Sequence, residues 1–419
     1  MNKKLLDMVK RQKISRDNFL SREYIPRSQL KEKEELLKPS LIKIITGPRR
    51  AGKSIFLFLL LKGIDFMYAN FDDEELLNNI DSKEEFLDAL QLVYGSTKTI
   101  LLDEIQNLSN WDLFLNKLQR YGYNVFVTGS NSNLLSGEFA SSLTGRYRTL
   151  EILPFSYEEN LKINNINPDN NTQNMLVIES FLKYGGFPEI LINKTDPETF
   201  MSNLIFSIIY KDITKRYKIR EPKKIELLIS YLIANTCQNL SHSKISFVTH
   251  IKNYRTVDKY LNFVENSYIF FFLSRFDTKP AIRLASNKKI YIIDNGFLSY
   301  KNLFVSPNSG VFLENLVFTE LIKKGFSVNS NLFYYKTKTN KEIDFVIKGN
   351  QTGIIKLIQV CFDITNDQTE KREMQALIEA SNELDCNDLT IITMYEDKEK
   401  TIENKNIKFV SFCKWTSIL

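Results

Sequence analysis

Short apolar runs alternate with amphipathic helical patterns over the first third of the chain. Five of these runs have the length and the β-branched or aromatic content of buried strands. They are Leu41–Thr46, Phe66–Phe71, Thr99–Leu102, Asn124–Thr128 and Thr149–Leu153. Strands separated by helices are typical of a parallel sheet with helices on both faces. The pattern therefore predicts an α/β domain over residues 1–153, which begins with an N-terminal helix.

The middle of the chain has a different pattern. Residues 154–208 are helical and are interrupted at Tyr184–Glu189, which indicates a helical lid or linker. Residues 209–303 contain three helical patterns followed by two strand patterns, and Thr256 is the expected cap of the third helix. That helix and the two strands are predicted at Thr256–Ser267, Tyr268–Leu273 and Lys289–Ile293. Three short helices before a two-stranded wing are the outline of a winged helix.

Residues 304–419 form a third, mixed α/β region. The expected elements are a helix over Val311–Lys324, a helix near Glu370–Asn382, and strands at Leu332–Lys336, Ile343–Lys348, Ile355–Val360 and Leu389–Thr393. At 419 residues the chain is too long for one core, so separate domains are expected at 1–153, 154–208, 209–303 and 304–419.

Composition limits the kinds of catalytic site, metal site and partner that are expected. Two histidines and four widely spaced cysteines leave no zinc-ligand spacing and argue against imidazole-based triads. The longest apolar run, Ile55–Leu61, is too short to span a bilayer, so we expect a cytoplasmic protein with no membrane partner. A net charge of +6 permits a nucleic-acid partner without requiring one.

The segment between the first strand and the following helix fits the pattern G-x-x-x-x-G-K-[ST]. Its residues are Gly47, Pro48, Arg49, Arg50, Ala51, Gly52, Lys53 and Ser54. Such a loop points backbone N–H groups and a helix N-terminus at a phosphate chain. Lys53 is expected to reach the β- and γ-phosphates, and Ser54 to offer a hydroxyl to Mg²⁺. The loop therefore predicts a nucleoside triphosphate with Mg²⁺ as the bound cofactors.

Two adjacent carboxylates follow the strand at Thr99–Leu102. The carboxyl ends of parallel strands face the ligand crevice, so Asp103 and Glu104 should emerge beside the phosphates. Asp103 is expected to support Mg²⁺, and Glu104 to activate the attacking water.

Two further polar segments are candidates for sensing the phosphate. The Asn124–Thr128 strand runs into Gly129, Ser130 and Asn131, where Ser130 is the first choice for a γ-phosphate sensor and Asn131 the second. A generic turn would explain the same residues. Arg146 is a candidate arginine finger, either in its own site or across the interface of a homo-oligomer, and a structural ion pair is the alternative.

The Asn193–Asp196 segment matches a guanine-reading signature, but Asp196 before Pro197 is also a helix start, so adenine is preferred. The basic segment Lys211–Lys224 could contact a phosphodiester backbone. The helix at Thr256–Ser267 carries one basic residue and two acids, which weakens a groove-reading role. Double-stranded DNA and a protein therefore remain alternative partners.

Taken together, these segments resemble the bacterial and archaeal AAA+ ATPases in which a P-loop core is fused to a C-terminal domain of poorly defined function. The resemblance rests on Gly47–Ser54, Leu101–Glu104, Thr128–Ser130, Leu143–Arg146, Tyr184–Glu189, Thr256–Tyr260, Tyr268 and Lys289–Gly296. It implies ATP binding and hydrolysis in the first domain, a winged helix in the middle and a restriction-endonuclease-like fold at the end.

An endonuclease-like fold would place a metal-binding set at Glu314, Asp344 and Gln359. The position of its lysine is taken by Cys361, and a thiol cannot replace an ammonium charge. We therefore expect a weakened binding or partner-recognition module, unless Lys336 or Lys356 reaches the same place.

The leading hypothesis is an Mg²⁺-dependent ATPase whose nucleotide state rearranges C-terminal domains that bind DNA or a protein. The alternatives are a metal-dependent DNA nuclease regulated by the ATPase, and a switch that binds nucleotide and DNA without hydrolysis. A P-loop kinase of small molecules is disfavoured, because Glu104 would activate water.

Overall fold

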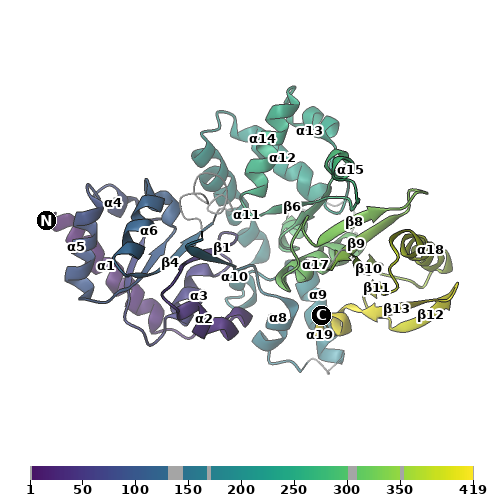
Figure 1. Ribbon diagram of the computed structural model, residues 1–419, viewed down its shortest axis with the longest axis horizontal. Coiled ribbons are helices and arrows are strands. Elements are labelled where there is room, and N and C mark those ends of the chain that lie inside the picture. The colour runs from purple at the N-terminus through teal and green to yellow at the C-terminus, as the bar shows by residue number, and fades with distance from the viewer. Residues whose placement is uncertain (1, 131–144, 168–170, 301–308, 350–352, 419) are drawn as a thin grey trace. The chain divides into compact units, whose positions relative to one another are not determined.

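The computed structural model describes residues 2–130, 145–167, 171–300, 309–349 and 353–418 (Figure 1). They form two compact units. The first comprises Met1–Leu153 with Asn266–Tyr268, and the second comprises Pro154–Glu265 with Ile269–Leu419. No helix among the described residues is long and apolar enough to cross a membrane.

The first unit is built on a parallel five-stranded sheet with the order β2-β3-β4-β1-β5. Its strands are β1 (Ile42–Thr46), β2 (Met67–Asn70), β3 (Thr99–Asp103), β4 (Asn124–Gly129) and β5 (Tyr147–Glu151). Its helices are α1 (Lys3–Leu20), α2 (Lys33–Leu37), α3 (Lys53–Leu60), α4 (Glu74–Leu77), α5 (Lys83–Tyr94) and α6 (Trp111–Arg120), with 3-10 turns η1 (Ser28–Glu32) and η2 (Ile105–Asn107). The predicted parallel α/β sheet is confirmed, although β5 begins and ends two residues earlier than expected.

Helices cover both faces of this sheet. Along β1, Ile42 and Ile44 join a core with α1, α5 and α6, whereas Ile45 joins a core with α3. This alternation follows from the two-residue period of a strand. Because β3, β4 and β1 are neighbours in a parallel sheet, the residues that follow these strands lie at one edge.

The second unit begins with helices. They are α8 (Tyr157–Ile163), α9 (Asn171–Tyr184), α10 (Pro188–Leu191), α11 (Pro197–Ser207), the π-helical turn η4 (Ile208–Lys215), α12 (Pro222–Ala234), α13 (His242–Thr249) and α14 (Tyr254–Glu265). The predicted break after Tyr184 is present, and Gly185 has φ of +75°. A Cβ on Gly185 would lie 1.7 Å from Asp294 Oδ1, so this turn requires glycine.

Two predicted helix starts have different outcomes. Asp196 caps α11, because its Oδ2 accepts a hydrogen bond from Thr199 N at 2.8 Å. The helix expected from Thr256 instead begins at Tyr254, and Asn253 Oδ1 accepts from Arg255 N at 2.9 Å. The prediction of Thr256 as a cap was wrong because the nearby asparagine takes that role.

After α14, β6 (Phe270–Leu273) pairs antiparallel with β7 (Lys289–Ile292), as predicted. The short helices α15 (Pro280–Ala285) and α16 (Gly296–Ser299) precede and follow β7. The start predicted at Tyr268 was too early, since Tyr268 has a left-handed φ of 62° and lies outside β6.

A mixed six-stranded sheet with the order β12-β13-β11-β10-β9-β8 forms the rest of the second unit. Its strands are β8 (Leu332–Lys336), β9 (Glu342–Lys348), β10 (Ile354–Val360), β11 (Leu389–Thr393), β12 (Lys398–Ile402) and β13 (Lys405–Ser411), accompanied by α17 (Ser309–Lys323), α18 (Asp367–Leu384) and α19 (Phe412–Ile418). The sequence pattern did not predict β12 or β13. β12 is a half-exposed strand rich in lysine and glutamate at the sheet edge, so it carries no buried apolar run.

Candidate nucleotide-binding site

The loop between β1 and α3 curls through an unusual backbone path. Gly47, Arg50 and Gly52 have φ values of 135°, 65° and 93°. A Cβ on Gly47 would lie 2.1 Å from the carbonyl oxygen of Ile152, so the close approach of these segments requires glycine. The loop leads directly into the first turn of α3, and the N-terminus of a helix is a favourable place for an anion.

The other residues of the loop divide into buried and accessible ones. Pro48 and Ala51 are buried, and Arg50 is exposed. Arg49 Nη1 lies 3.5 Å from Asp72 Oδ2. Two buried residues thus support the loop, while the side chain of Arg50 is accessible to solvent.

Lys53 lies against the loop that it is expected to serve. Its Nζ donates to the carbonyl oxygens of Gly47 at 3.1 Å and Pro48 at 3.0 Å, and it lies 3.9 Å from Glu104 Oε1. The side chain is buried, with 5% of the residue exposed. Phosphate oxygens would give this buried ammonium stronger, charge-assisted contacts than the two neutral carbonyls do.

Asp103 stands at the end of β3 among three hydroxyl groups. Its Oδ1 accepts from Ser54 Oγ at 2.9 Å and from Thr128 Oγ1, and its Oδ2 accepts from Tyr68 Oη at 3.3 Å. Burial, followed by the charge of Glu104, raises the pKa of Asp103, and the hydrogen bonds from Thr128 and Ser54 oppose the rise. The two predicted metal-supporting oxygens, on Ser54 and Asp103, therefore lie side by side.

Glu104 continues the chain in a left-handed conformation, with φ of 53° and ψ of 46°. Its backbone N donates to Thr128 Oγ1 at 2.9 Å, and its Oε2 accepts from Gln106 Nε2 at 2.5 Å. Such backbone strain in a residue with a side chain costs about 1–3 kcal/mol and is concentrated at functional sites. The turn places the Glu104 carboxylate beside the phosphate loop, near Lys53.

Ser130 follows β4 at the same edge of the sheet. It is 1% exposed, and its Oγ has no hydrogen-bond partner among the described residues. A buried hydroxyl without a partner costs free energy, so such groups need an explanation. A bound phosphate oxygen would supply the missing partner. Asn131, the second choice for a sensor, lies outside the described residues.

Arg146 lies at the opposite end of β1. Its carbonyl oxygen accepts from Ile42 N at 2.9 Å, and Ile42 is the first residue of β1, whereas the phosphate loop follows the last. The placement in its own site was therefore wrong, and a role in a neighbouring subunit stays a prediction. Arg148 forms ion pairs with Glu32 and Glu35, at 2.5 and 3.5 Å.

A cavity of about 460 Å³ opens beside the Ser54–Asp103 pair. It is lined by Arg11, Gln12, Ser15, Phe19, Ser54, Tyr68, Asn70, Asp73 and Asp103. The sequence analysis did not select Tyr68 or Thr128. A hydroxyl residue next to the end of a parallel strand was the signal that could have identified Thr128, whereas Tyr68 is the second residue of β2 and had no such signal.

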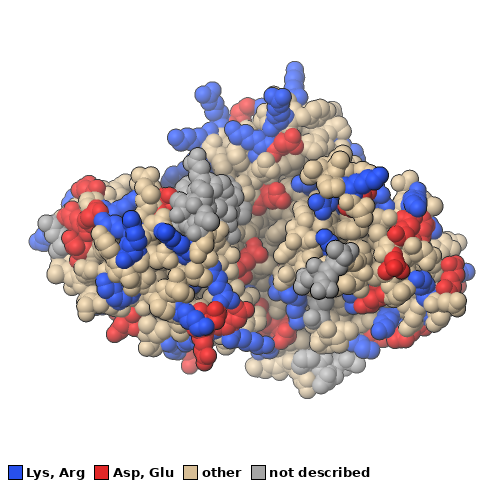
Figure 2. Space-filling view, viewed as in Figure 1, with Lys and Arg blue, Asp and Glu red and all other residues tan. Residues whose placement is uncertain are grey.

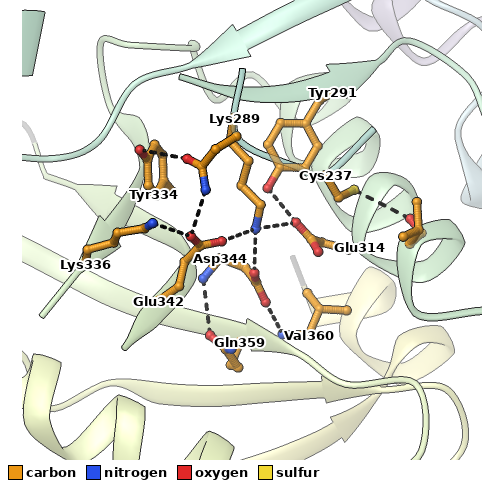
Figure 3. A network of polar contacts seen from close by, with 12 residues as sticks. Cys237, Lys289, Tyr291, Glu314, Tyr334, Lys336, Glu342, Asp344, Gln359 and Val360 are labelled. Carbon is orange, nitrogen blue, oxygen red and sulfur yellow. Dashed lines mark hydrogen bonds and ion pairs between the residues drawn. The ribbon is translucent and has the colours of Figure 1, made fainter. Parts of the chain in front are cut away.

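The predicted nuclease residues come together in the second unit (Figure 3). Glu314 on α17 and Asp344 on β9 lie 2.7 and 2.8 Å from the Nζ of Lys289, and Gln359 on β10 accepts from Asp344 N at 3.2 Å. Cys361 Sγ donates to Asp363 O at 3.2 Å. Within the described part of the chain, no group of three or more His, Cys, Asp or Glu residues is arranged to hold a metal ion.

Lys289 is the lysine that the sequence analysis missed. Of the two lysines considered there, Lys356 pairs with Asp388 at 3.6 Å, and Lys336 lies 3.4 Å from Glu342, a carboxylate that also contacts Lys289. Lys289 was noticed only as the start of a strand. A single lysine that opens an otherwise apolar buried strand was the available signal.

Three family models match successive parts of the chain. A family model described as AAA domain matches residues 39–161. Two models of domains of unknown function, DUF8612 and DUF4143, match residues 176–307 and 309–414. The first match confirms that the loop, β3 and β4 belong to an AAA-type P-loop domain.

Two relatives align with nearly the whole chain. The uncharacterized protein MJ1544 of Methanocaldococcus jannaschii is 37% identical over 91% of this chain and 89% of its own length. The chain belongs to the family of this protein. A second member, an uncharacterized protein of Haemophilus influenzae, is 31% identical over 85% of this chain and 89% of its own length. The family thus has members in distant organisms that share almost the full length of this AAA protein.

Solved structures that align with this chain have lower sequence identity than these two relatives. The Walker-type ATPase PABY2304 of Pyrococcus abyssi aligns with 16% identity and a TM-score of 0.42, over 67% of this chain and 98% of that one. The Orc1 protein of Aeropyrum pernix, solved in complex with DNA, aligns with 11% identity and a TM-score of 0.32, over 74% and 97%.

Proposed function

We propose that the AAA domain binds ATP with Mg²⁺ and hydrolyses it. The observation that carries this proposal is the convergence of Lys53, Ser54, Asp103 and Glu104 at the carboxyl edge of one parallel sheet. Each element of phosphoryl transfer to water has a residue here, including a cation for the phosphates, oxygens for the metal and a base for the water.

The residues present fit Mg²⁺. This ion prefers hard oxygen ligands, and Ser54 Oγ and Asp103 Oδ1 already lie 2.9 Å apart. Ser54 would bind the ion and Asp103 would hold it, directly or through water. When bound, Mg²⁺ neutralises charge on the β- and γ-phosphates. Lys53 would move from the carbonyl oxygens of the loop to those phosphates.

Glu104 is proposed as the general base. Its carboxylate is held by Gln106 and lies 3.9 Å from Lys53, so it stands where a water could attack the γ-phosphate. Ser130, whose buried hydroxyl has no partner among the described residues, is proposed to sense that phosphate. This arrangement favours hydrolysis over a switch that only binds nucleotide.

Steady-state ATP turnover tests this assignment. We expect Glu104→Gln to retain ATP binding and to lose about 10²- to 10⁴-fold in turnover, as removal of a general base does. Lys53→Ala should lose both binding and turnover. Lys62→Ala, which changes an exposed lysine just after α3, is the matched control and should behave like the wild type. Unchanged turnover in both site variants would show that the assignment is wrong.

We further propose that α12–α14 with β6 and β7 form a winged helix that contacts double-stranded DNA. The surface of α13, α14 and the turn between them is basic and aromatic. Its exposed members are Lys244, Phe247, Lys252, Tyr254, Arg255 and Lys259. Figure 2 shows Lys and Arg side chains projecting at the top of the view, where Figure 1 labels α12, α13 and α14.

Two features of this basic and aromatic face favour nucleic acid over a purely structural role. The earlier start of α14 adds Arg255 to its first turn, the part of a recognition helix that meets base edges. Phe247 and Tyr254 are 81% and 55% exposed, which is unusual for aromatic side chains unless they contact a partner. The acid Asp258 on α14 pairs with His242 at 2.7 Å.

Binding to a fluorescent duplex, measured by anisotropy at several salt concentrations, tests the DNA proposal. The variant K252A/R255A/K259A should bind at least tenfold more weakly and lower the slope of log K against log salt by about 0.9 for each phosphate that is no longer neutralised. The control K371A/K408A/K414A removes three exposed lysines from the C-terminal region and should bind normally. Wild-type protein that turns over ATP but does not bind DNA would favour a protein partner instead.

We propose that nucleotide state controls this contact. Duplex affinity measured with ATP and with ADP, in the Glu104→Gln background, should differ at least severalfold. Equal duplex affinities with ATP and ADP would show that nucleotide state does not control DNA binding.

A further inference from the structure

A buried lysine occupies the centre of the carboxylate cluster in the second unit (Figure 3). Lys289 Nζ lies 2.7 Å from Glu314 Oε1, 2.9 Å from Glu342 Oε1 and 2.8 Å from Asp344 Oδ1. The residue is 2% exposed. Three carboxylates supplied by α17 and β9 thus converge on one ammonium group from β7.

The three carboxylates that face this ammonium have further donors. Asp344 Oδ2 accepts from Val360 N at 3.0 Å, and Glu314 Oε1 accepts from Tyr291 Oη at 2.8 Å. The second oxygen of Glu342 lies 3.4 Å from Lys336 Nζ. A metal ion entering here would have to displace the ammonium and compete with these donors.

Both polar atoms of the Gln359 side-chain amide are already hydrogen-bonded. Its Oε1 accepts from Asp344 N at 3.2 Å, and its Nε2 donates to Glu373 Oε2 at 2.6 Å. The amide oxygen that would serve as a metal ligand is therefore part of the link between β9 and β10.

The charges are balanced by the chain itself. Three carboxylates face two ammonium groups, Lys289 and Lys336, so the cluster needs no external cation to be nearly neutral.

We propose that this cluster is a cation site filled permanently by the chain's own Lys289, in the position where a divalent metal would otherwise be held. The intact protein then takes no divalent metal at Glu314, Glu342 and Asp344, and it does not cut DNA there. The cluster instead joins β7, α17 and β9 into one rigid support. Removal of the ammonium would uncover a site for a hard divalent cation such as Mn²⁺ or Ca²⁺.

The proposal concerns the second unit and does not depend on ATP hydrolysis. Manganese binding is measured on nucleotide-free full-length protein by the thermal shift that Mn²⁺ produces and by paramagnetic resonance of free Mn²⁺. We expect little binding by the wild type, and at least tenfold tighter binding, with a Tm rise of several degrees, for Lys289→Ala. Lys356→Ala, which removes the neighbouring lysine that pairs with Asp388 outside the cluster, is the matched control and should resemble the wild type.

Two further variants complete the test. Adding Asp344→Asn to Lys289→Ala should abolish the new binding. If Lys289→Ala does not fold because three carboxylates repel one another, K289A/E342Q keeps two ligands with less charge and should still gain Mn²⁺ binding. Folded lysine variants without Mn²⁺ binding would overturn the proposal. So would wild-type Mn²⁺ binding or plasmid cleavage that Asp344→Asn abolishes.

Discussion

The hydroxyl of Ser54 donates to Asp103 Oδ1 at 2.9 Å. Ser54 lies in the first turn of α3, and Asp103 is the last residue of β3. This contact sets two oxygens side by side at the edge of the sheet where the phosphate loop begins. The relationship fits the proposed Mg²⁺ better than a softer metal ion, because both donors are hard oxygens.

The role of Ser54 predicts a defect specific to Mg²⁺. In Ser54→Ala, the Mg²⁺ concentration for half-maximal ATP turnover should rise about 10- to 100-fold, as it does when a support of a metal site is removed. ATP affinity measured without Mg²⁺ should change less than about twofold, because the contacts between the loop and the phosphates do not involve the metal and remain in place. Ser96→Ala, an exposed serine in the same unit, is the control. An unchanged Mg²⁺ requirement would contradict the assigned role.

Mutation of Ser130 should affect ATP turnover, whereas mutation of Thr128 should affect stability. Ser130→Ala removes a buried hydroxyl that has no partner among the described residues, so the unfolding free energy should change by less than about 0.5 kcal/mol while ATP turnover falls. Thr128→Val breaks hydrogen bonds to Asp103 and Glu104 and should destabilise the unit by about 1–3 kcal/mol. Urea unfolding and turnover measurements on both variants separate these effects. Full turnover in Ser130→Ala would rule it out as a sensor.

The phosphate loop should tolerate no side chain at Gly47. A Cβ there would lie 2.1 Å from a backbone oxygen, so Gly47→Ala should lower the stability of the first unit by about 2–4 kcal/mol. Gly63→Ala is the matched control, because it also has a positive φ, of +87°, but no atom lies within 4 Å of its Cβ among the described residues. It should cost only about 1–2 kcal/mol.

The two tryptophans allow this unit to be followed separately. Trp111 is in α6 of the first unit and Trp415 is in α19 of the second. In a Trp415→Phe background, fluorescence reports on the first unit alone. Equal losses of stability in the Gly47 and Gly63 variants would contradict the close approach to Ile152.

Lys43 predicts a pH dependence of the first unit. Burial lowers the pKa of Lys43 to about 8, although its Nζ donates to Asn124 Oδ1 at 2.5 Å. Between that value and the ordinary lysine pKa, the unfolded chain binds a proton that the folded chain lacks, so stability rises with pH. Relative to Lys43→Met, the wild type should gain about 2 kcal/mol between pH 8 and 10. A constant difference between the two proteins would contradict the lowered pKa.

Much of the fold could be predicted from local pattern. The strands β1 to β4 are short runs of mostly buried residues, and β8, β9, β10 and β11 were found within one residue of their observed ends. The apolar pattern did not predict a strand that is mostly exposed and charged, such as the edge strand β12. It also misjudged the start of α14, because Asn253 competes with Thr256 as the cap.

The candidate site could be predicted only where its residues follow one another in a motif. The Gly47–Ser54 loop and the Asp103–Glu104 pair are adjacent in sequence, so both were found. Lys289 joins Glu314 and Asp344 only through the tertiary fold, since these residues come from three separate elements. For Arg146 the motif left its own site and a neighbouring subunit as alternatives, and the pairing of β5 with β1 sets the residue at the end of β1 away from the phosphate loop.

Calorimetric binding of a non-hydrolysable ATP analogue with Mg²⁺, compared between wild type and Lys53→Ala, tests the central claim most directly. We predict one nucleotide bound per wild-type chain and at least tenfold weaker binding by the variant. Folded wild-type protein that shows neither heat of binding nor a thermal shift with any purine triphosphate would contradict the account, as would equal affinities for the two proteins.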